Sequence, residues 1–313
     1  MIVATVLLLI IILYVFYCYY ITNRNSAKIK DIKYKKISSD KKIALCFMIY
    51  DKINNEDLWY EFIKNIDKSK YNIYIHYKYD KPLKYFDEYK IPNPIKTNWG
   101  CISLVYAQNL LLKYALKDSD NKHFIFLSQS CVPLKPFNYI YSKLDTNKSY
   151  FNLMKNNVIH HKSNNLIKYF KKEHIQKASQ WSILNRKHAK LLIDNEKHIK
   201  DWFYTIIENN KKYKNILYAL DEIVYICILN KMNMQDELKL TNNIGVGATT
   251  ISYWMDTNKV KTYKKSRYLK YRPFEYTHIC IEELKEYVES DSLFARKFID
   301  KCTGLEKLKD IIK

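Results

Sequence analysis

The sequence contains very little glycine. Only 4 of its 313 residues are glycine, and GxGxxG, P-loop and GxSxG motifs are all absent. Each of these motifs needs glycines where the backbone turns sharply or closely approaches a phosphate. Their absence excludes a glycine-rich dinucleotide-binding or triphosphate-binding loop and the nucleophile elbow of an α/β-hydrolase.

Recognisable metal-binding and disulfide patterns are also missing. The 7 cysteines form no CxxC pair, HExxH is absent, and His160 and His161 are adjacent rather than four residues apart. A zinc site is therefore not predicted. An odd number of cysteines does not fit a framework in which every cysteine forms a disulfide, although an odd number is compatible with one or two disulfides. Cys46, Cys227 and Cys280 lie within apolar runs and are expected as small core residues.

Acidic residues are in deficit. The chain has 53 basic and 32 acidic residues, which gives a net charge of +21. This charge would attract anions such as phosphorylated substrates, nucleic acid or a membrane surface. The lysines are nevertheless spread along the whole chain, which favours a compositional bias and a solvated surface. There is no recognition motif or clustered basic helix, so nucleic acid is not an expected partner. The hydrophobic content of 48 % is enough for a substantial core.

The first 23 residues contain no charged side chain. About 20 apolar residues span a bilayer, and no basic n-region or small-residue cleavage site marks a signal peptide. We therefore expect three parts: a transmembrane anchor over 1–23, a basic stalk over 24–41 and a globular domain over 42–313. The basic residues follow the anchor, so the positive-inside rule alone would keep the domain in the cytoplasm.

The strongest pattern in the globular part is a strand that begins with the apolar run Phe124–Leu127. Four consecutive apolar residues are typical of a strand buried on both faces. The chain then becomes polar at Ser128–Ser130 and reaches Pro133, which cannot donate to a ladder. In open α/β sheets, ligands bind in the crevice beyond the carboxyl ends of the strands.

Strands and helices alternate around this strand, which predicts an α/β class with a doubly wound sheet. The expected strands are 43–50, 71–76, 95–99, 149–154, 178–184 and 249–254. The expected helices are 57–66, 109–116, 137–144, 186–194, 196–208, one beginning at Asp221, 282–289 and 304–313.

Two acidic motifs have competing interpretations. Asp118 and Asp120 form a DxD pair, which could hold a divalent ion, but they precede the central strand and are expected as turn residues. The carboxyl end of that strand carries no carboxylate and is a poor site for a hard cation. Asp221 and Glu222 begin a helix, and on pattern alone they are helix caps.

Five blocks, taken together and in order, resemble the core-2/I-branching β-1,6-N-acetylglucosaminyltransferase family, particularly its plant-type branch. The blocks are Trp99–Val105, Leu127–Leu134, Ser179–Arg186, Asp221–Glu222 and Phe294–Phe298. The resemblance implies a GT-A, Rossmann-like domain with a central, mostly parallel sheet and an N-terminal transmembrane helix. It further implies an inverting transfer from a nucleotide sugar with no metal cofactor, and a single-pass type II protein with a lumenal Golgi or ER domain.

The resemblance assigns roles to individual residues. Glu222 matches the general base, and a carboxylate in a first helical turn is stabilised as an anion. Lys297 matches a lysine that holds the donor diphosphate, whose leaving charge needs a cation when no metal is present. The family's second basic residue is unmatched, because Thr277 falls near its position. Arg272 and Arg267 are nearby substitutes.

Aromatic and histidine residues complete the expected site. His76 ends the second strand, at a position where the family contacts the donor. A purely structural role for this histidine is an equal alternative. Trp254 falls near an aromatic that stacks on the acceptor sugar, although a core tryptophan is equally compatible with it. Trp181 and Trp99 are expected to be packing residues of their motifs.

The function expected from the resemblance is transfer of N-acetylglucosamine from UDP-GlcNAc to a hydroxyl of a glycan or glycoprotein acceptor. One alternative keeps the fold and changes the donor to UDP-xylose or UDP-glucuronic acid. Another is a non-catalytic glycan-binding protein on a degenerate transferase scaffold.

Overall fold

The computed structural model describes residues 41–154, 166–212, 219–241, 249–253 and 273–313. All of them lie in one compact unit, residues 38–313. No helix in these ranges is long and apolar enough to cross a membrane. The predicted anchor, 1–23, and all but the last residue of the stalk lie outside the described residues.

A six-stranded mixed sheet runs through the centre, with strand order β2-β1-β3-β6-β5-β7. Its strands are β1 (Lys42–Ile49), β2 (Tyr71–Tyr77), β3 (Asn121–Ser128), β5 (Ser149–Asn152), β6 (Ile183–Asn185) and β7 (Leu238–Thr241). β1 pairs in parallel with both β2 and β3, and β5 pairs in parallel with β7. β6 is antiparallel to both of its neighbours, β3 and β5. The predicted α/β class is confirmed, and the sheet is mixed.

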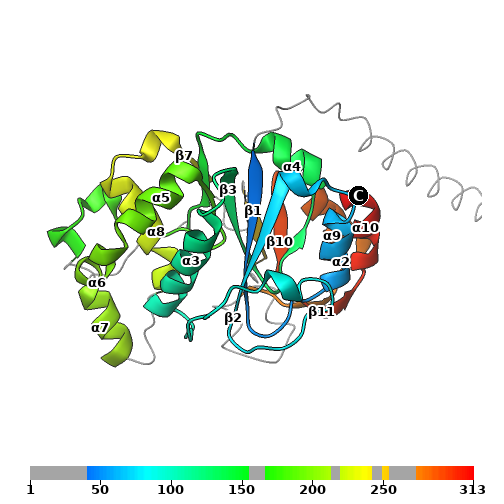
Figure 1. Cartoon of the computed structure of the whole chain (residues 1–313), viewed down its shortest axis with the longest axis horizontal. Helices are drawn as coiled ribbons and strands as arrows, with labels where there is room; N and C mark the ends of the chain where they lie inside the picture. Colours follow the sequence, from blue (N-terminus) through cyan, green and yellow to red (C-terminus); the bar gives the residue numbers. More distant parts are fainter. Residues whose placement is uncertain (1–40, 155–165, 213–218, 242–248, 254–272) are drawn as a thin grey trace, which may run out of the picture. The chain divides into compact units, whose positions relative to one another are not determined.

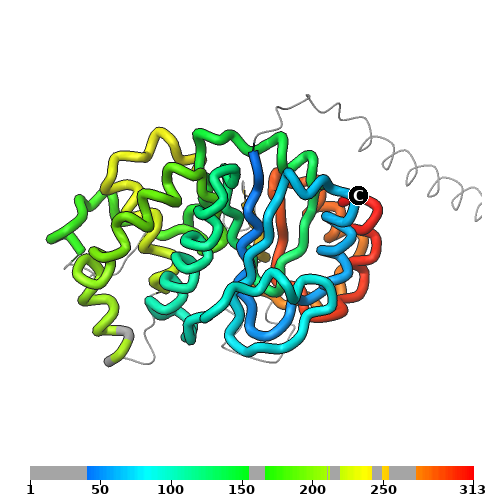
Figure 2. Tube along the Cα trace, in the orientation of Figure 1, coloured from blue at the N-terminus to red at the C-terminus, as the bar shows by residue number. Residues whose placement is uncertain are grey.

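Helices cover both faces of the sheet (Figure 1). One group consists of α3 (Ile102–Ala115), α5 (Arg186–Asp194), α6 (Ile199–Trp202), α7 (Tyr204–Lys212) and α8 (Val224–Lys231). The other consists of α2 (Glu56–Ile63), α4 (Phe137–Lys143), α9 (Ile281–Glu289) and α10 (Leu308–Ile312). α10 packs beside α2, so the last helix of the described chain lies against its first helix (Figure 2).

β1 shows why two helix layers are needed. Leu45 and Phe47 belong to one buried cluster, whereas Ala44 and Cys46 belong to the other. Successive side chains on a strand point to opposite faces, so an unbroken apolar run needs apolar partners on both sides. The same alternation holds in β3, whose Phe124–Leu127 run is at most 1 % exposed.

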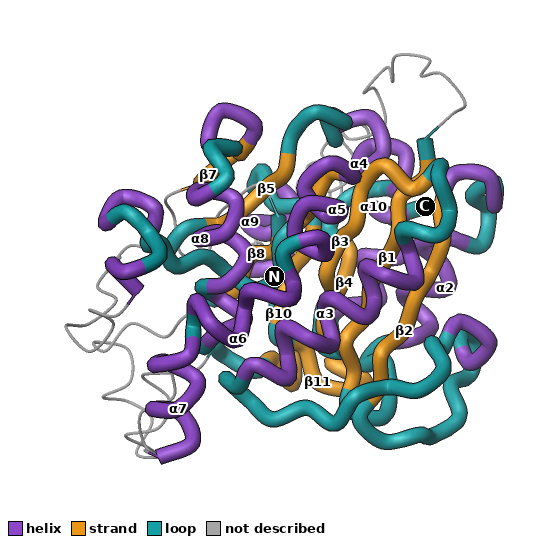
Figure 3. Tube along the Cα trace, turned by 60° about the vertical axis from the view of Figure 1, so that its left-hand side comes forward, coloured by secondary structure: helices purple, strands orange, loops and turns teal. Residues whose placement is uncertain are grey.

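Two smaller sheets complete the fold (Figure 3). β10 (Phe294–Arg296) lies between β4 (Val132–Pro133) and β8 (Thr250–Ser252). β11 (Phe298–Thr303) pairs with β9 (Tyr276–His278). Pro133 occupies an edge strand, the position that a residue without an N–H tolerates. β10 therefore brings the last part of the described chain to the turn that follows β3.

Several expected elements differ from the structure. Residues 95–99 form no strand, because Lys90 and Ile91 contact β2 at Ile75 and the chain then leaves the sheet. The expected strand 178–184 is reduced to β6 and an isolated bridge at Ala178. α3 begins at Ile102, before the expected 109–116. The expected helix 196–208 is broken at Phe203, a fully buried residue with non-helical backbone angles.

Candidate functional site

A pocket of about 290 Å³ opens at the carboxyl ends of β2, β1 and β3. Its walls also include the loop before α3, the segment before α8, the segment before β9 and the end of β10. The lining residues include His76, Trp99, Trp181, Asp221, Glu222, Arg296 and Lys297. This is the crevice that the polar end of the central strand predicts.

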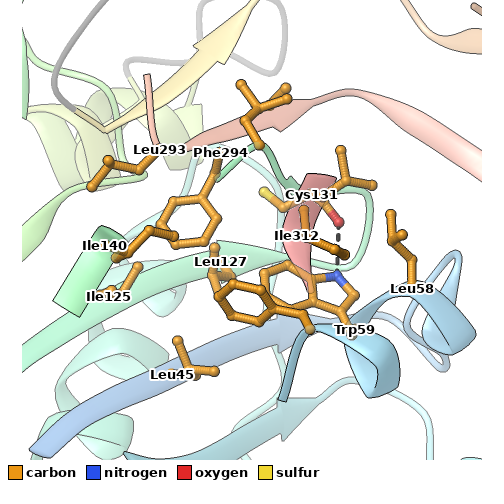
Figure 4. Close-up of a cluster of buried hydrophobic side chains, with 14 of the residues drawn as sticks. Leu45, Leu58, Trp59, Ile125, Leu127, Cys131, Ile140, Leu293, Phe294 and Ile312 are labelled. Atoms are coloured by element: carbon orange, nitrogen blue, oxygen red, sulfur yellow. Dashed lines mark hydrogen bonds between the residues drawn. The ribbon is translucent and has the colours of Figure 1, made fainter. Parts of the chain in front are cut away.

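The turn after β3 forms the floor of the site through a closed hydrogen-bond network. Ser128 Oγ lies 3.0 Å from Ser130 Oγ and 3.1 Å from Cys131 Sγ. Trp59 donates its indole N–H to the carbonyl of Cys131 at 2.9 Å (Figure 4). Phe298 N–H donates to the carbonyl of Ser130 at 3.0 Å. The turn is therefore held by the core beneath it and by the strand that carries Lys297.

Glu222 lies in the turn Leu220–Glu222, immediately before α8. Its carbonyl accepts a hydrogen bond from Ala178 N–H at 2.8 Å, and its Oε2 forms an ion pair with Lys177 Nζ at 2.8 Å. The side chain is 21 % exposed, so the carboxylate is partly shielded but accessible from the pocket. The sequence predicts a helix that begins at Asp221, whereas α8 begins at Val224 and Glu222 lies in the turn before it. The lysine partner was not predicted.

Asp221 also lines the pocket, beside Glu222. Its Oδ1 is buried and has no hydrogen-bond partner among the described residues. Burial, together with the charge of Glu222, raises the pKa of Asp221 to about 7. The site therefore contains two neighbouring carboxyl groups, and Asp221 is the one that titrates near neutral pH.

Two cations face these carboxyl groups from the end of β10. Lys297 lines the pocket and forms an ion pair with Glu275. Arg296 stacks its guanidinium over the ring of Trp181, with 4.9 Å from Cζ to the ring centre. Its buried Nε has no hydrogen-bond partner in the described part of the chain. Burial lowers the pKa of Arg296, yet an arginine keeps its charge at neutral pH.

His76 is 1 % exposed and lies at the wall of the pocket. Its Nε2 accepts the N–H of Ile95 at 3.1 Å, and burial lowers the pKa of the imidazole to about 4. The ring is therefore neutral at physiological pH and supports the loop at residue 95. This contact favours the structural alternative, while the predicted contact of His76 with the donor stays a prediction.

The DxD pair lies at the opposite end of β3. Asp118 forms an ion pair with Lys42 at 2.9 Å and accepts a hydrogen bond from Asn72 at 2.8 Å. It also accepts the N–H of Asp120 at 2.8 Å, which closes the turn. The prediction that these are turn residues is confirmed. In the described ranges no three His, Cys, Asp or Glu side chains come together as a metal site.

Other predicted residues have mixed outcomes. Arg272, Arg267 and Trp254 lie outside the described residues. Trp181 is 8 % exposed and packs against Arg296, so its packing role is confirmed. Trp99 is 66 % exposed at the pocket, and its predicted packing role is wrong because no core covers the loop before α3.

One of the three cysteines predicted to lie in the core differs from that prediction. Cys46 and Cys227 are fully buried as predicted, whereas Cys280 is only partly buried, at the start of α9. Burial in an apolar environment raises the pKa of the Cys227 thiol to about 12. All six cysteines in the described part of the chain have free thiols.

Sequence reasoning missed two charged residues of the site. Arg296 directly precedes Lys297, and a basic pair between Phe294 and Phe298 was the available signal. Lys177 gave no signal, because lysine is abundant throughout the chain. Both residues become conspicuous only when the fold brings them beside the carboxyl groups.

Comparison with known proteins gives a family match. The model of the family described as Core-2/I-Branching enzyme matches residues 43–285, well over half of the chain. A curated relative, Glycosyltransferase BC10 of Oryza sativa subsp. japonica, is 26 % identical over 169 residues. The matched part is 51 % of this chain and 42 % of the rice protein, so the chain spans less than half of that relative's length.

Solved structures show a weaker similarity. Galactosyltransferase LgtC in complex with donor and acceptor sugar analogues has a TM-score of 0.39 at 8 % identity, over 86 % of this chain and 95 % of that one. A glycosyltransferase involved in the glycosylation of the major capsid of PBCV-1 has a TM-score of 0.34 at 9 % identity, over 86 % and 97 %. These TM-scores are too low to support an argument about function.

The family match covers four of the five sequence blocks in full, all but the last at residues 294–298, and the rice relative agrees with the plant-type resemblance. The chain therefore belongs to the Core-2/I-branching enzyme family.

Proposed function

We propose that the protein is an inverting glycosyltransferase of the GT-A type that moves a sugar from a nucleotide donor to a hydroxyl of a glycan acceptor. The observation that carries this proposal is the composition of the pocket. A carboxylate, Glu222, and two adjacent cations, Arg296 and Lys297, line the same crevice at the carboxyl ends of the central strands. Family membership supplies the reaction class.

In the proposed reaction Glu222 removes the proton from the acceptor hydroxyl. The acceptor oxygen then attacks the anomeric carbon of the donor sugar, and the bond between that carbon and the diphosphate oxygen breaks. The electron pair of this bond leaves with the nucleoside diphosphate. A positioned general base of this kind typically contributes 10²–10⁴-fold to the rate.

Arg296 and Lys297 would stabilise the negative charge that grows on the leaving diphosphate. Arginine suits this role, because its planar fork can donate two parallel hydrogen bonds to phosphate oxygens. The guanidinium of Arg296 is already oriented by the Trp181 ring. On this basis we assign Arg296 as a cation of the proposed donor site beside Lys297, and Arg272, outside the described residues, stays a prediction.

The donor that we propose is UDP-GlcNAc, and the linkage is the β-1,6 branch of the family. UDP-xylose and UDP-glucuronic acid are the alternative donors, and a non-catalytic glycan-binding protein is the alternative of a different class. Release of UDP from a panel of nucleotide sugars, with and without glycan acceptors, separates these candidates. No turnover of any donor, together with retained glycan binding, would favour the non-catalytic protein.

Metal independence is part of the proposal. The polar turn Ser128–Ser130 offers no carboxylate to a divalent ion, and the charge on the leaving group is assigned to two cationic side chains instead. We expect turnover to persist in EDTA. Loss of turnover that Mn²⁺ restores would contradict this part of the proposal.

We also propose that residues 1–23 anchor the protein in the membrane, with the catalytic domain in the Golgi or ER lumen, where acceptor glycans occur. The basic residues after the anchor argue for the opposite orientation, but long domains can translocate regardless of flanking charge. Protease protection in sealed microsomes tests this orientation. Digestion of the domain without detergent would place it in the cytoplasm.

A further inference from the structure

The Glu222 carboxylate has a cationic partner that the family resemblance did not indicate. Lys177 Nζ lies 2.8 Å from Glu222 Oε2, within hydrogen-bond distance. Among the described residues no hydrogen-bond partner is found for the other oxygen, Oε1. The two oxygens of this carboxylate are thus in different environments, one fixed by an ammonium group and the other available.

The backbone around Lys177 is held in place independently of this ion pair. Met154 N–H donates to the carbonyl of Lys177 at 3.0 Å, and Ala178 forms an antiparallel bridge with Leu153. Ala178 N–H in turn donates to the carbonyl of Glu222 at 2.8 Å. Lys177 and Glu222 are therefore joined both through backbone atoms and through side chains, next to the end of the central sheet.

We propose that Lys177 is a positioning residue for the reaction, which holds the Glu222 carboxylate by Oε2 and leaves Oε1 to take the proton of the acceptor hydroxyl. This inference rests on the proposed function. A carboxylate that is fixed at one oxygen is already ordered before the acceptor binds. The free-energy cost of placing the base in its productive geometry is then lower in the transition state.

The charges around Glu222 make the ammonium group important. Asp221 is the adjacent carboxyl group on the same turn, while Arg296 and Lys297 face the pair from the end of β10. Removing Lys177 leaves Glu222 next to Asp221 without its nearest cation. The Glu222 carboxylate would then also lose the contact that fixes its Oε2.

The test is a kinetic comparison of Lys177→Met, Lys177→Arg and the unmodified full chain, with UDP release as the assay. We expect Lys177→Met to lower kcat by about 10–100-fold, part of the range for a general base. The KM for the donor should change less than about threefold, because Lys177 is assigned to Glu222 and not to the diphosphate. Lys177→Arg should recover most of the rate.

Lys187→Met is the matched control. Lys187 also forms an ion pair with a glutamate, Glu237, but this pair lies outside the residues that line the pocket. Its removal should leave kcat unchanged. A purely structural role for Lys177 would lower the melting temperature without lowering the kcat of the folded variant.

Two results would overturn the inference. One is a Lys177→Met variant that keeps kcat within about twofold while the unmodified protein is active. The other is a loss of rate that Lys177→Arg does not restore although the variant is folded and binds UDP. If the unmodified protein turns over no nucleotide sugar, the proposed function fails and the role of Lys177 in it fails as well.

Discussion

The guanidinium of Arg296 lies flat over Trp181, 4.9 Å from the centre of the ring, and both residues line the candidate site. Stacking on the indole orients this cation. Arg296 forms no ion pair among the described residues, although the charges of Glu222, Glu275 and Asp221 act on it. Its neighbour Lys297 forms an ion pair with Glu275 instead. Two adjacent cations are thus held by different contacts.

The charge and the shape of the side chain at residue 296 should therefore contribute separately to the affinity for UDP. Arg296→Ala should weaken UDP binding about tenfold or more, because charge-assisted hydrogen bonds contribute about 1.5–3 kcal/mol. Arg296→Lys keeps the charge but loses the stacking on Trp181 and the two parallel donors of the guanidinium. Its affinity for UDP should therefore lie between those of Arg296→Ala and the unmodified protein. Calorimetric titration with UDP measures these affinities. Lys285→Ala, an exposed change on α9, is the control. Equal affinity for Arg296→Ala and the unmodified protein would remove this residue from the donor site.

Glu222→Gln tests the proposed base. The amide keeps the shape of the side chain but cannot take a proton at neutral pH. Turnover should fall by about 10² or more, while the affinity for UDP stays within about threefold. Glu208→Gln, at an exposed ion pair on α7, is the matched control and should leave turnover unchanged. A Glu222→Gln variant with nearly full turnover would reassign the base, with Asp221 as the next candidate.

Asp221 should make the stability of the protein depend on pH. Its pKa of about 7 in the folded chain exceeds the ordinary value of 3.8, so between these values the folded state binds a proton that the unfolded state lacks. Stability should therefore fall as pH rises through this window, by up to about 4 kcal/mol from this group. Asp221→Asn should melt above the unmodified protein at pH 8, and the difference should shrink towards pH 5.

Melting curves recorded from pH 5 to pH 8 provide this measurement. The exposed Asp236 supplies the comparison, because Asp236→Asn should give no such trend. A constant difference across the pH range would mean that Asp221 is ionised throughout.

Trp59 should be a major contributor to stability. It is 1 % exposed, contacts the rings of Phe47, Phe62 and Phe294, and donates its N–H to Cys131 (Figure 4). Trp59→Phe leaves a buried carbonyl without a partner and a partly empty site. The free energy of unfolding should fall by roughly 2–4 kcal/mol in urea titration. Trp99→Phe, at a 66 % exposed position, should change it by less than about 0.5 kcal/mol. A small effect at Trp59 would show that the core relaxes around the change.

The central strands could be predicted because their apolar runs are local and unambiguous. β1 and β2 lie within one residue of the predicted bounds, whereas β3 begins at Asn121, three residues before the predicted start at Phe124. The short strands β4, β10 and β11 were not predicted, because two to six residues carry little periodicity, and β4 pairs with β10 across more than 100 residues of chain. The break at Phe203 is a tertiary effect, since its buried ring takes precedence over helical continuity.

The candidate site was predicted in a different way. The crevice followed from the polar end of the central strand, a physical argument that the pocket at Ser128–Ser130 supports. Glu222 and Lys297 came from the family resemblance, since a pattern alone favours a helix cap and a surface lysine. Arg296 and Lys177 required the structure, because each becomes chemically distinctive only through a neighbour distant in the chain.

Strand β10 has a consequence for the synthesis of the protein. The floor of the crevice is made by residue 131, but its cationic wall comes with residues 294–297, of which Phe294 and Ala295 pair with β4. N-terminal parts of a chain fold first during translation. This wall can therefore assemble only after residue 297 has left the ribosome, so a nascent chain halted before residue 294 carries an incomplete site.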